Sequence, residues 1–220
     1  MTKGARPLRS DGDATRSRIL ESAGRLIAAS GYAETTSKAV AADAGVDLAS
    51  INYHFGNRSG LYQAVLAEGH RGLVSLSELS RLADSGLSAS EQLREVLDRI
   101  VGGIVEADGW HVRVIAREIA SPSPHLDMLF AQEVMPKMAR LVQVISQITG
   151  IPAGDPALMR CLLSVAAPCL MLMIGGHLPG PIQQVFQMPR AVLVGHLHAF
   201  AMAGLAEAGR QHALNASASP

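Results

Sequence analysis

Two short segments, each opened by a helix-capping residue, constrain the fold of this chain more than any other feature. Thr36 and Asp47 are residue types that cap helix N-termini, and Gly45 follows the first segment. Glycine readily adopts the left-handed backbone conformation that ends a helix. We therefore predict two helices, over 37–44 and 48–54, joined by a tight turn.

A longer amphipathic helix precedes this pair. Ile19, Ala23 and Ile27 fall on one stripe at helical spacing, and Gly31 ends the pattern, which predicts a helix over 13–30. Three helices with a tight turn between the last two form a helix-turn-helix unit. In such a unit the second short helix is the one that enters the major groove of DNA.

The remainder of the chain also has helical periodicity, and no segment alternates as a strand does. The composition is 48% hydrophobic but only 4% aromatic, which favours packed helices over sheets. A long helix is expected to start near Arg58, and Pro136 should kink the helix that contains it. The other expected helices are 89–107, 110–120, 124–149, 155–176 and 188–209.

The fold class is therefore all-α, with an N-terminal three-helix DNA-binding domain followed by a larger helical domain. Polar or aperiodic sequence marks both ends of the chain. The expected divisions are a flexible basic arm over 1–12, the helix-turn-helix domain over 13–57, the second domain over 58–209 and a disordered tail over 210–220.

The formal net charge is zero and the sequence pI is about 7.1, which excludes a strongly basic nucleic-acid coat protein. Any DNA contact must therefore be local. Cys161 and Cys169 lie too far apart on one helix to form a disulfide, so we expect buried thiols in a reducing compartment, with a bridge between subunits as the alternative.

No signal peptide is expected, because the charged N-terminus lacks an apolar segment. The longest apolar run, Leu162–Gly176, contains Pro168 and is shorter than the roughly 20 residues that span a bilayer. We interpret the run as a buried helix of a cytoplasmic protein that has no membrane partner.

The sequence TTSKAVAADAGV over 35–46, followed by INYHFGNRSGLY over 51–62, closely resembles the signature of the TetR family of transcriptional regulators. The resemblance covers about the first quarter of the chain. It implies a homodimer that binds a double-stranded DNA operator. The DNA-binding residues that it implies are Thr36, Ser37, Lys38, Leu48, Ala49, Asn52, Tyr53, His54 and Arg58.

Within this set the resemblance assigns base contacts to Leu48, Ala49 and Asn52. Thr36 caps its helix, Ser37 and Lys38 face the DNA, and three further side chains contact phosphates. Those three are Tyr53, His54 and Arg58, the last standing where family members usually carry Lys. Asn52 stands where many members carry Tyr, and Asn is able to pair bidentately with adenine.

Simpler roles remain open for three side chains of this segment. His54 either contacts a phosphate or packs against the helix that follows. Lys38 either binds DNA or is a solvated surface charge. Asp47 is either near the DNA or only a helix cap, and its negative charge would repel phosphate.

In the second domain, the segment VIAREIASPS over 114–123 resembles the CecR-like subgroup of the family. The last two helices are apolar on nearly every side, which predicts burial against a second copy in a four-helix dimer seam. The residues expected to line an effector pocket are Trp110, Arg113, Arg117, Glu118, Phe130, Met135, Met138 and Met171.

Each of these pocket residues also has a structural alternative. The methionine and aromatic positions fit an ordinary core as well as a pocket, and Arg117 and Glu118 fit a structural ion pair. Two arginines on one helix face, Arg113 and Arg117, point weakly to an anionic effector.

The sequence carries no signature of a catalytic, metal or nucleotide site, so we expect no enzyme, no cofactor and no metal. The leading hypothesis is a repressor that a small-molecule effector releases from a palindromic operator. Two alternatives are a regulator without an effector and an enzyme or carrier with a vestigial DNA-binding domain. The effector, the operator, the target genes and the choice between repression and activation are not specified by the sequence.

Overall fold

The structure is a computed structural model that describes residues 8–105, 109–175, 180–181 and 183–218. The chain is 82% helical and contains no strands in the described part, which confirms the all-α fold class. It divides into two compact units. Unit 1 comprises residues 1–69 and 109–129, and unit 2 comprises residues 70–108 and 130–220.

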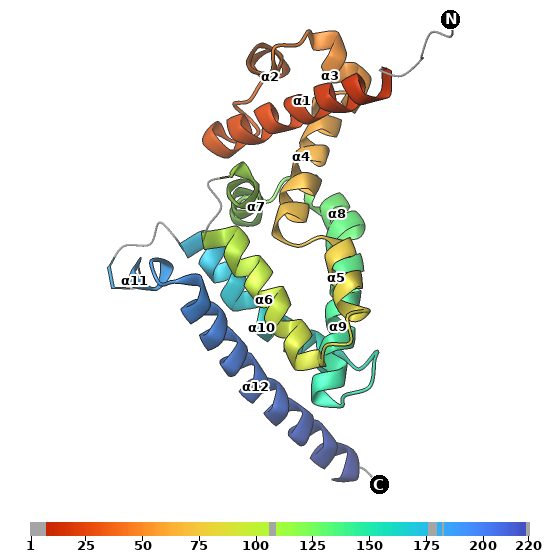
Figure 1. Cartoon of the computed structure of the whole chain (residues 1–220), viewed down its shortest axis with the longest axis vertical. Coiled ribbons are helices and arrows are strands. Elements are labelled where there is room, and N and C mark those ends of the chain that lie inside the picture. The colour runs from red at the N-terminus through yellow and green to blue at the C-terminus, as the bar shows by residue number, and fades with distance from the viewer. Residues whose placement is uncertain (1–7, 106–108, 176–179, 182, 219–220) are drawn as a thin grey trace, which may run out of the picture. The chain divides into compact units, whose positions relative to one another are not determined.

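Unit 1 contains the three N-terminal helices, most of the fourth, and two helices from the middle of the chain (Figure 1). These helices are α1 (Leu8–Ser30), α2 (Ser37–Ala44), α3 (Leu48–Phe55), α4 (Arg58–Leu73, up to Gly69), α7 (Trp110–Ala120) and α8 (Leu126–Leu129).

The two short helices α2 and α3 form as their caps predict. Thr36 Oγ1 accepts a hydrogen bond from the Ala39 amide at 3.1 Å, and Asp47 Oδ1 accepts one from the Ser50 amide at 2.7 Å. Gly45 has a φ of 63°, a conformation that residues with a Cβ seldom adopt. The predicted bounds are confirmed for α2, and α3 extends one residue further than predicted.

Helix α7 packs against α1, so the DNA-binding helices share a core with a segment that the sequence placed in the second domain. The indole of Trp110 is 2% exposed and lies over Gly24, and its Nε1 donates to Glu21 at 2.8 Å. Arg117 donates to the Ala28 and Ala29 carbonyls at the C-terminal end of α1, each at 3.0 Å.

Unit 2 begins with the last residues of α4 and buries its core mainly among four long helices. Its helices are α5 (Leu76–Ala83), α6 (Ala89–Val105), η1 (Phe130–Val134), α9 (Met135–Thr149), α10 (Pro156–Gly175), α11 (Gln183–Phe186) and α12 (Arg190–Ala218). Leu93, Ile145 and Leu158, from three different helices, are almost fully buried in the main core. Cys161 and Cys169 are free and buried, as predicted.

The helix predicted over 124–149 is not continuous. It consists of α8, the π-helix η1 and α9. Pro136 has no amide hydrogen and its ring crowds the preceding turn, so regular α-helical hydrogen bonding is interrupted there. The kink predicted at Pro136 therefore takes the form of a five-residue π-helix immediately before α9.

Both ends of the chain are more helical than predicted. Helix α1 begins at Leu8, inside the segment expected to be a flexible arm, while residues 1–7 lie outside the described part. The expected disorder over 210–220 is wrong up to Ala218, because α12 continues that far. Alanine is a strong helix former, and the ion pair of Arg210 with Glu207 lies within this last section.

Two glycines of α1 give opposite predictions for substitution by alanine. A Cβ at Gly24 would lie 2.1 Å from the Trp110 ring, whereas a Cβ at Gly12 meets no atom within 4 Å. Gly24→Ala should therefore destabilise the protein by about 1–3 kcal/mol through overpacking. Gly12→Ala should stabilise it by about 0.5–1 kcal/mol, because alanine favours the helix. Urea unfolding measures both, and equal effects of the two substitutions would contradict this packing.

Candidate functional site

Helix α3 presents a compact exposed face while one residue anchors it. Ile51 is fully buried, whereas Tyr53 is 86% exposed and Asn52 is also exposed. Leu48 and Ala49 are exposed on the first turn of the same helix. The face combines one amide, one phenol and small apolar groups, which suits contact with base edges and thymine methyl groups.

The start of α2 adds a positive charge to unit 1. Lys38 is exposed and has no ion-pair partner among the described residues. Ser37 is half-buried, and the hydroxyl of Thr36 is occupied as the N-cap. An exposed lysine at a helix N-terminus suits a phosphate oxygen, whose negative charge the helix dipole also favours.

The family resemblance implies that Arg58 contacts a DNA phosphate, but in the structure its guanidinium group binds backbone carbonyls. Its guanidinium donates to the carbonyls of Thr35 (at 3.0 Å), Ala33 (at 2.9 Å) and Tyr32. It also lies 4.3 Å from the centre of the Tyr32 ring. Arg58 thus holds the α1–α2 connection in place, and this is a structural role that the sequence did not reveal.

His54 contacts a neighbour on its own helix, whereas Asp47 follows the simpler alternative of a helix cap. His54 is half-buried, and its ring meets the Tyr53 ring edge-on with centres 5.0 Å apart. Asp47 accepts hydrogen bonds from the hydroxyl and the amide of Ser50, and these bonds lower the pKa of its carboxyl group. The N-cap therefore accounts for Asp47 without a DNA contact.

The eight residues expected around an effector are divided between the two units. In unit 1, Trp110 and Arg117 contact α1 as described above, and Arg113 is exposed. Glu118 is buried and accepts hydrogen bonds from the Tyr62 hydroxyl at 2.6 Å and from Ser123. Among the described residues, no cationic side chain pairs with Glu118. The ion pair between Arg117 and Glu118 that the sequence suggested is therefore not present in this part of the chain.

The other four expected pocket residues lie in unit 2. Phe130, Met135 and Met171 are exposed, and Met138 packs against the main core. None of the eight residues lines the pocket that contains Lys137 and Glu133.

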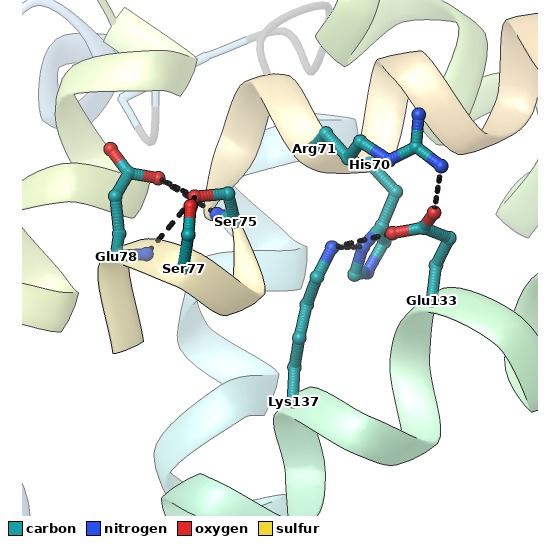
Figure 2. Close-up of polar contacts among 7 residues, drawn as sticks. All are labelled: His70, Arg71, Ser75, Ser77, Glu78, Glu133 and Lys137. Carbon is teal, nitrogen blue, oxygen red and sulfur yellow. Dashed lines mark hydrogen bonds and ion pairs between the residues drawn. The ribbon is translucent and has the colours of Figure 1, made fainter. Parts of the chain in front are cut away.

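A cluster of charged side chains in unit 2 surrounds a buried lysine (Figure 2). Lys137 is 3% exposed, and its Nζ lies 3.2 Å from Glu133 Oε2 and donates to His70 Nδ1 at 2.7 Å. Arg71 donates to the other oxygen of Glu133 at 2.5 Å. Because Nδ1 of His70 accepts, the ring proton of the neutral histidine is on Nε2.

Burial and neighbouring charges shift the pKa values of this cluster. Burial lowers the pKa of His70 to about 4, and the nearby Lys137 ammonium lowers it further. Burial also lowers the pKa of Lys137, although Glu133 opposes this effect. Burial raises the pKa of Glu133, but hydrogen bonds and charges from Arg71 and Lys137 outweigh it, so that the net shift is downward.

Sequence reasoning did not identify this cluster. Glu133 and Lys137 are spaced four residues apart, which is a signal for a surface ion pair on a continuous helix. Here the π-helix carries Glu133 and the segment is packed against the end of α4, so the pair is buried instead.

Helix-turn-helix geometry with an exposed second helix, joined in sequence to a larger helical unit, defines a DNA-binding regulator. Residues 19–65 match the model of the bacterial regulatory proteins of the tetR family, and residues 89–205 match the C-terminal domain of the HTH-type transcriptional dual regulator CecR. The chain belongs to the TetR family and carries a CecR-type C-terminal domain. Proteins of this family are DNA-binding regulators and not enzymes.

Solved structures of TetR-family regulators share the fold. The fatty acid degradation regulator FadR from Bacillus halodurans aligns with a TM-score of 0.68 at 14% identity, over 93% of this chain and 98% of that one. FadR from Bacillus subtilis, in complex with stearoyl-CoA, gives 0.67 at 14% identity, over 86% and 98%. A TetR-like regulator from Rhodococcus sp. RHA1 gives 0.62 at 19% identity, over 87% and 96%. No curated protein sequence gives a significant match.

The exposed face of α3 predicts which substitutions weaken DNA binding. Asn52→Ala and Tyr53→Ala should each lower the affinity for the DNA upstream of the chain's own gene by about 1–3 kcal/mol, since each removes one contact. Fluorescence anisotropy at fixed salt measures this loss. Arg94→Ala, which removes an exposed cation of α6, is the control and should bind as the wild type does. Equal affinity of all four proteins would contradict the assignment of α3.

The low pKa of His70 predicts that acid destabilises the protein. Unfolded histidine titrates near pH 6.5 and folded His70 near 4, so the unfolded state binds more protons between these values. The stability should therefore fall as the pH drops from 6.5 to 4, by up to about 3 kcal/mol, and should not change from this cause above 7.

The variant His70→Gln should lose this pH dependence, whereas His196→Gln, which replaces an exposed histidine, should keep it. Urea unfolding at a series of pH values measures the difference. Parallel curves for the wild type and His70→Gln between pH 6.5 and 4 would contradict the burial of a neutral His70.

Proposed function

We propose that this chain is a homodimeric repressor that a small-molecule effector releases from a palindromic operator. The observation that carries the proposal is the exposed face of α3, where Asn52 and Tyr53 project from a helix that Ile51 anchors. A regulator built in this way reads base edges with one short helix per subunit. The proposal places the protein in the cytoplasm.

An unpartnered apolar surface on α10 and α12 supports the dimer. Leu163 is 65% exposed and Phe200 is 71% exposed, and Met159 and Val192 are about half exposed. Large exposed apolar patches mark interaction surfaces in soluble proteins. A second copy of the same two helices would bury this surface in a two-fold seam, as the sequence predicts.

The same two helices are long and apolar enough to cross a membrane by length and composition. Helix α10 has 20 residues, Pro156–Gly175, and corresponds to the helix predicted over 155–176. A dimer seam accounts for this composition together with the TetR-family fold, whereas a membrane span would leave the match of residues 89–205 unexplained.

A dimer places two α3 helices on successive major grooves about 34–36 Å apart, which requires an operator with inverted repeats. Helix α4 starts in unit 1 and ends in unit 2, so it provides a covalent route from an effector to the reading helix. For a 100-fold relief of repression, the effector must favour the DNA-incompetent state by about 2.7 kcal/mol.

The comparisons favour a small-molecule effector and allow a second mode of regulation. FadR from Bacillus subtilis, which has this fold, was solved with stearoyl-CoA bound. The CecR model describes a dual regulator, so activation at some promoters is a second candidate function for this chain.

The apolar surface predicts the effect of a charge placed on it. Phe200→Lys should convert the dimer to a monomer and should also lower operator affinity at least tenfold, because a palindrome needs two linked reading helices. Sedimentation velocity and anisotropy measure the two effects. Leu87→Lys, at an exposed leucine before α6, should change neither. A Phe200→Lys protein that remains dimeric would refute this interface, and a monomeric wild type would refute the dimer itself.

A further inference from the structure

Unit 2 contains a pocket, lined mostly by polar and charged residues, that no assigned role uses. Its volume is about 300 Å³, which lies at the lower end of the range for small-molecule sites. The pocket is formed by the end of α4, the start of α5, and η1 with α9. Its lining residues are Arg71, Ser75, Leu76, Ser77, Gln132, Glu133, Pro136 and Lys137.

Lys137 brings a buried ammonium group to this pocket. An ammonium carries three N–H donors, and two acceptors, Glu133 Oε2 and His70 Nδ1, are seen for it among the described residues. The side chain is only 4% exposed, so little water is available for the remaining donor. A ligand oxygen that enters the pocket would supply the missing acceptor.

The charge of the pocket favours a negatively charged group. Among its lining residues, Arg71 and Lys137 are positive and only Glu133 is negative. Glu78, the nearest other carboxylate on α5, is bonded to the Ser75 amide and hydroxyl and pairs with Arg99 at 3.0 Å. His70 is neutral at pH 7, because its pKa is about 4.

A buried cluster of charges such as this one is an inefficient way to stabilise a fold. Burying a charged pair costs desolvation energy, and apolar residues of similar size often stabilise a protein more. Titratable groups with strongly shifted pKa values gather at functional sites. In addition, Glu133 is held by the π-helix η1, and single π-helical turns within α-helices are frequent at functional sites.

We propose that this pocket binds the anionic group, a carboxylate or a phosphate monoester, of a small organic effector. Arg71 and Lys137 donate to the anion, the hydroxyl groups of Ser75 and Ser77 line its approach, and the incoming anion replaces Glu133 as their partner. The inference rests on the proposed function, since it supplies the effector class for that regulator.

The position of the pocket in the chain gives the anion a means of acting on the DNA-binding unit. The chain passes from unit 1 to unit 2 between Gly69 and His70, and again between Leu129 and Phe130. Arg71 follows the first crossing by one residue, and the π-helix that carries Glu133 starts at the second. Exchange of Glu133 for an anion would therefore alter both connections.

Benzoate and phenyl phosphate test the site, with benzamide as the uncharged counterpart of benzoate. Each is titrated into the full-length protein at constant ionic strength while the thermal unfolding midpoint is recorded. We expect the midpoint to rise in a saturable manner with at least one of the two anions and not with benzamide. The response to each anion distinguishes a carboxylate site from a phosphate site.

Two variants assign the response to the pocket. Arg71→Gln and Lys137→Met should each weaken the apparent affinity about tenfold or more, because each removes a charge-assisted hydrogen bond. Arg71 has a half-exposed side chain, so its variant should fold even if Lys137→Met does not. Arg94→Gln on α6 is the matched control and should respond as the wild type does.

The proposal is overturned if neither anion raises the midpoint, if benzamide raises it equally, or if Arg71→Gln keeps the wild-type affinity. Anisotropy of the same preparations with the upstream DNA separates this failure from failure of the proposed function. If the protein binds DNA specifically but responds to neither anion, the proposed anion site is refuted and the proposed function stands. If it binds an anion at this pocket but no specific DNA, the proposed function is refuted instead.

Discussion

The organisation of unit 1 depends on the carbonyl groups at the C-terminal end of α1 and in the turn that follows. Helix ends leave carbonyls without partners, and buried ones must find donors. Arg117 of α7 supplies donors to Ala28 and Ala29, and Arg58 of α4 supplies them to the turn that begins at Tyr32. Two arginines from distant parts of the sequence thus fasten α4 and α7 to α1.

Because α4 and α7 are fastened to α1, α7 and the part of α4 up to Gly69 belong to the same compact unit as the helix-turn-helix. On the proposed function, an effector bound in unit 2 would act on this unit through the chain crossings at residues 69–70 and 129–130. The residues of the buried Lys137 cluster lie close to both of these positions in the sequence.

Local signals in the sequence were sufficient for the helix-turn-helix. The caps Thr36 and Asp47, with Gly45 between them, define α2 and α3 because capping and the left-handed glycine depend on a few neighbouring residues. A lack of apolar periodicity predicts a disordered tail, but alanine-rich sequence and the ion pair of Arg210 with Glu207 favour the continuation of α12 to Ala218.

Contacts between residues that are distant in the sequence could not be predicted from local signals such as caps and turns. Arg58 was expected on a phosphate because its role was carried over from related sequences, and its carbonyl partners lie 23–26 residues earlier. Glu118 was expected in a pocket, yet Tyr62, 56 residues away, is its partner. Lys137 is buried beside the π-helix that carries Glu133, and no local pattern in the sequence predicts that π-helix. The sequence also did not reveal that α7 packs against α1 in unit 1.

In the proposed homodimer, two copies of α3 read a palindromic DNA sequence. The most direct measurement is selection of bound sequences from a random double-stranded DNA library by the full-length protein, followed by sequencing. A homodimer that reads DNA through α3 should enrich an inverted repeat whose half-sites are centred about 10 base pairs, or a multiple of that spacing, apart. Enrichment of a single unrepeated motif, or of no motif at all, would contradict this proposal.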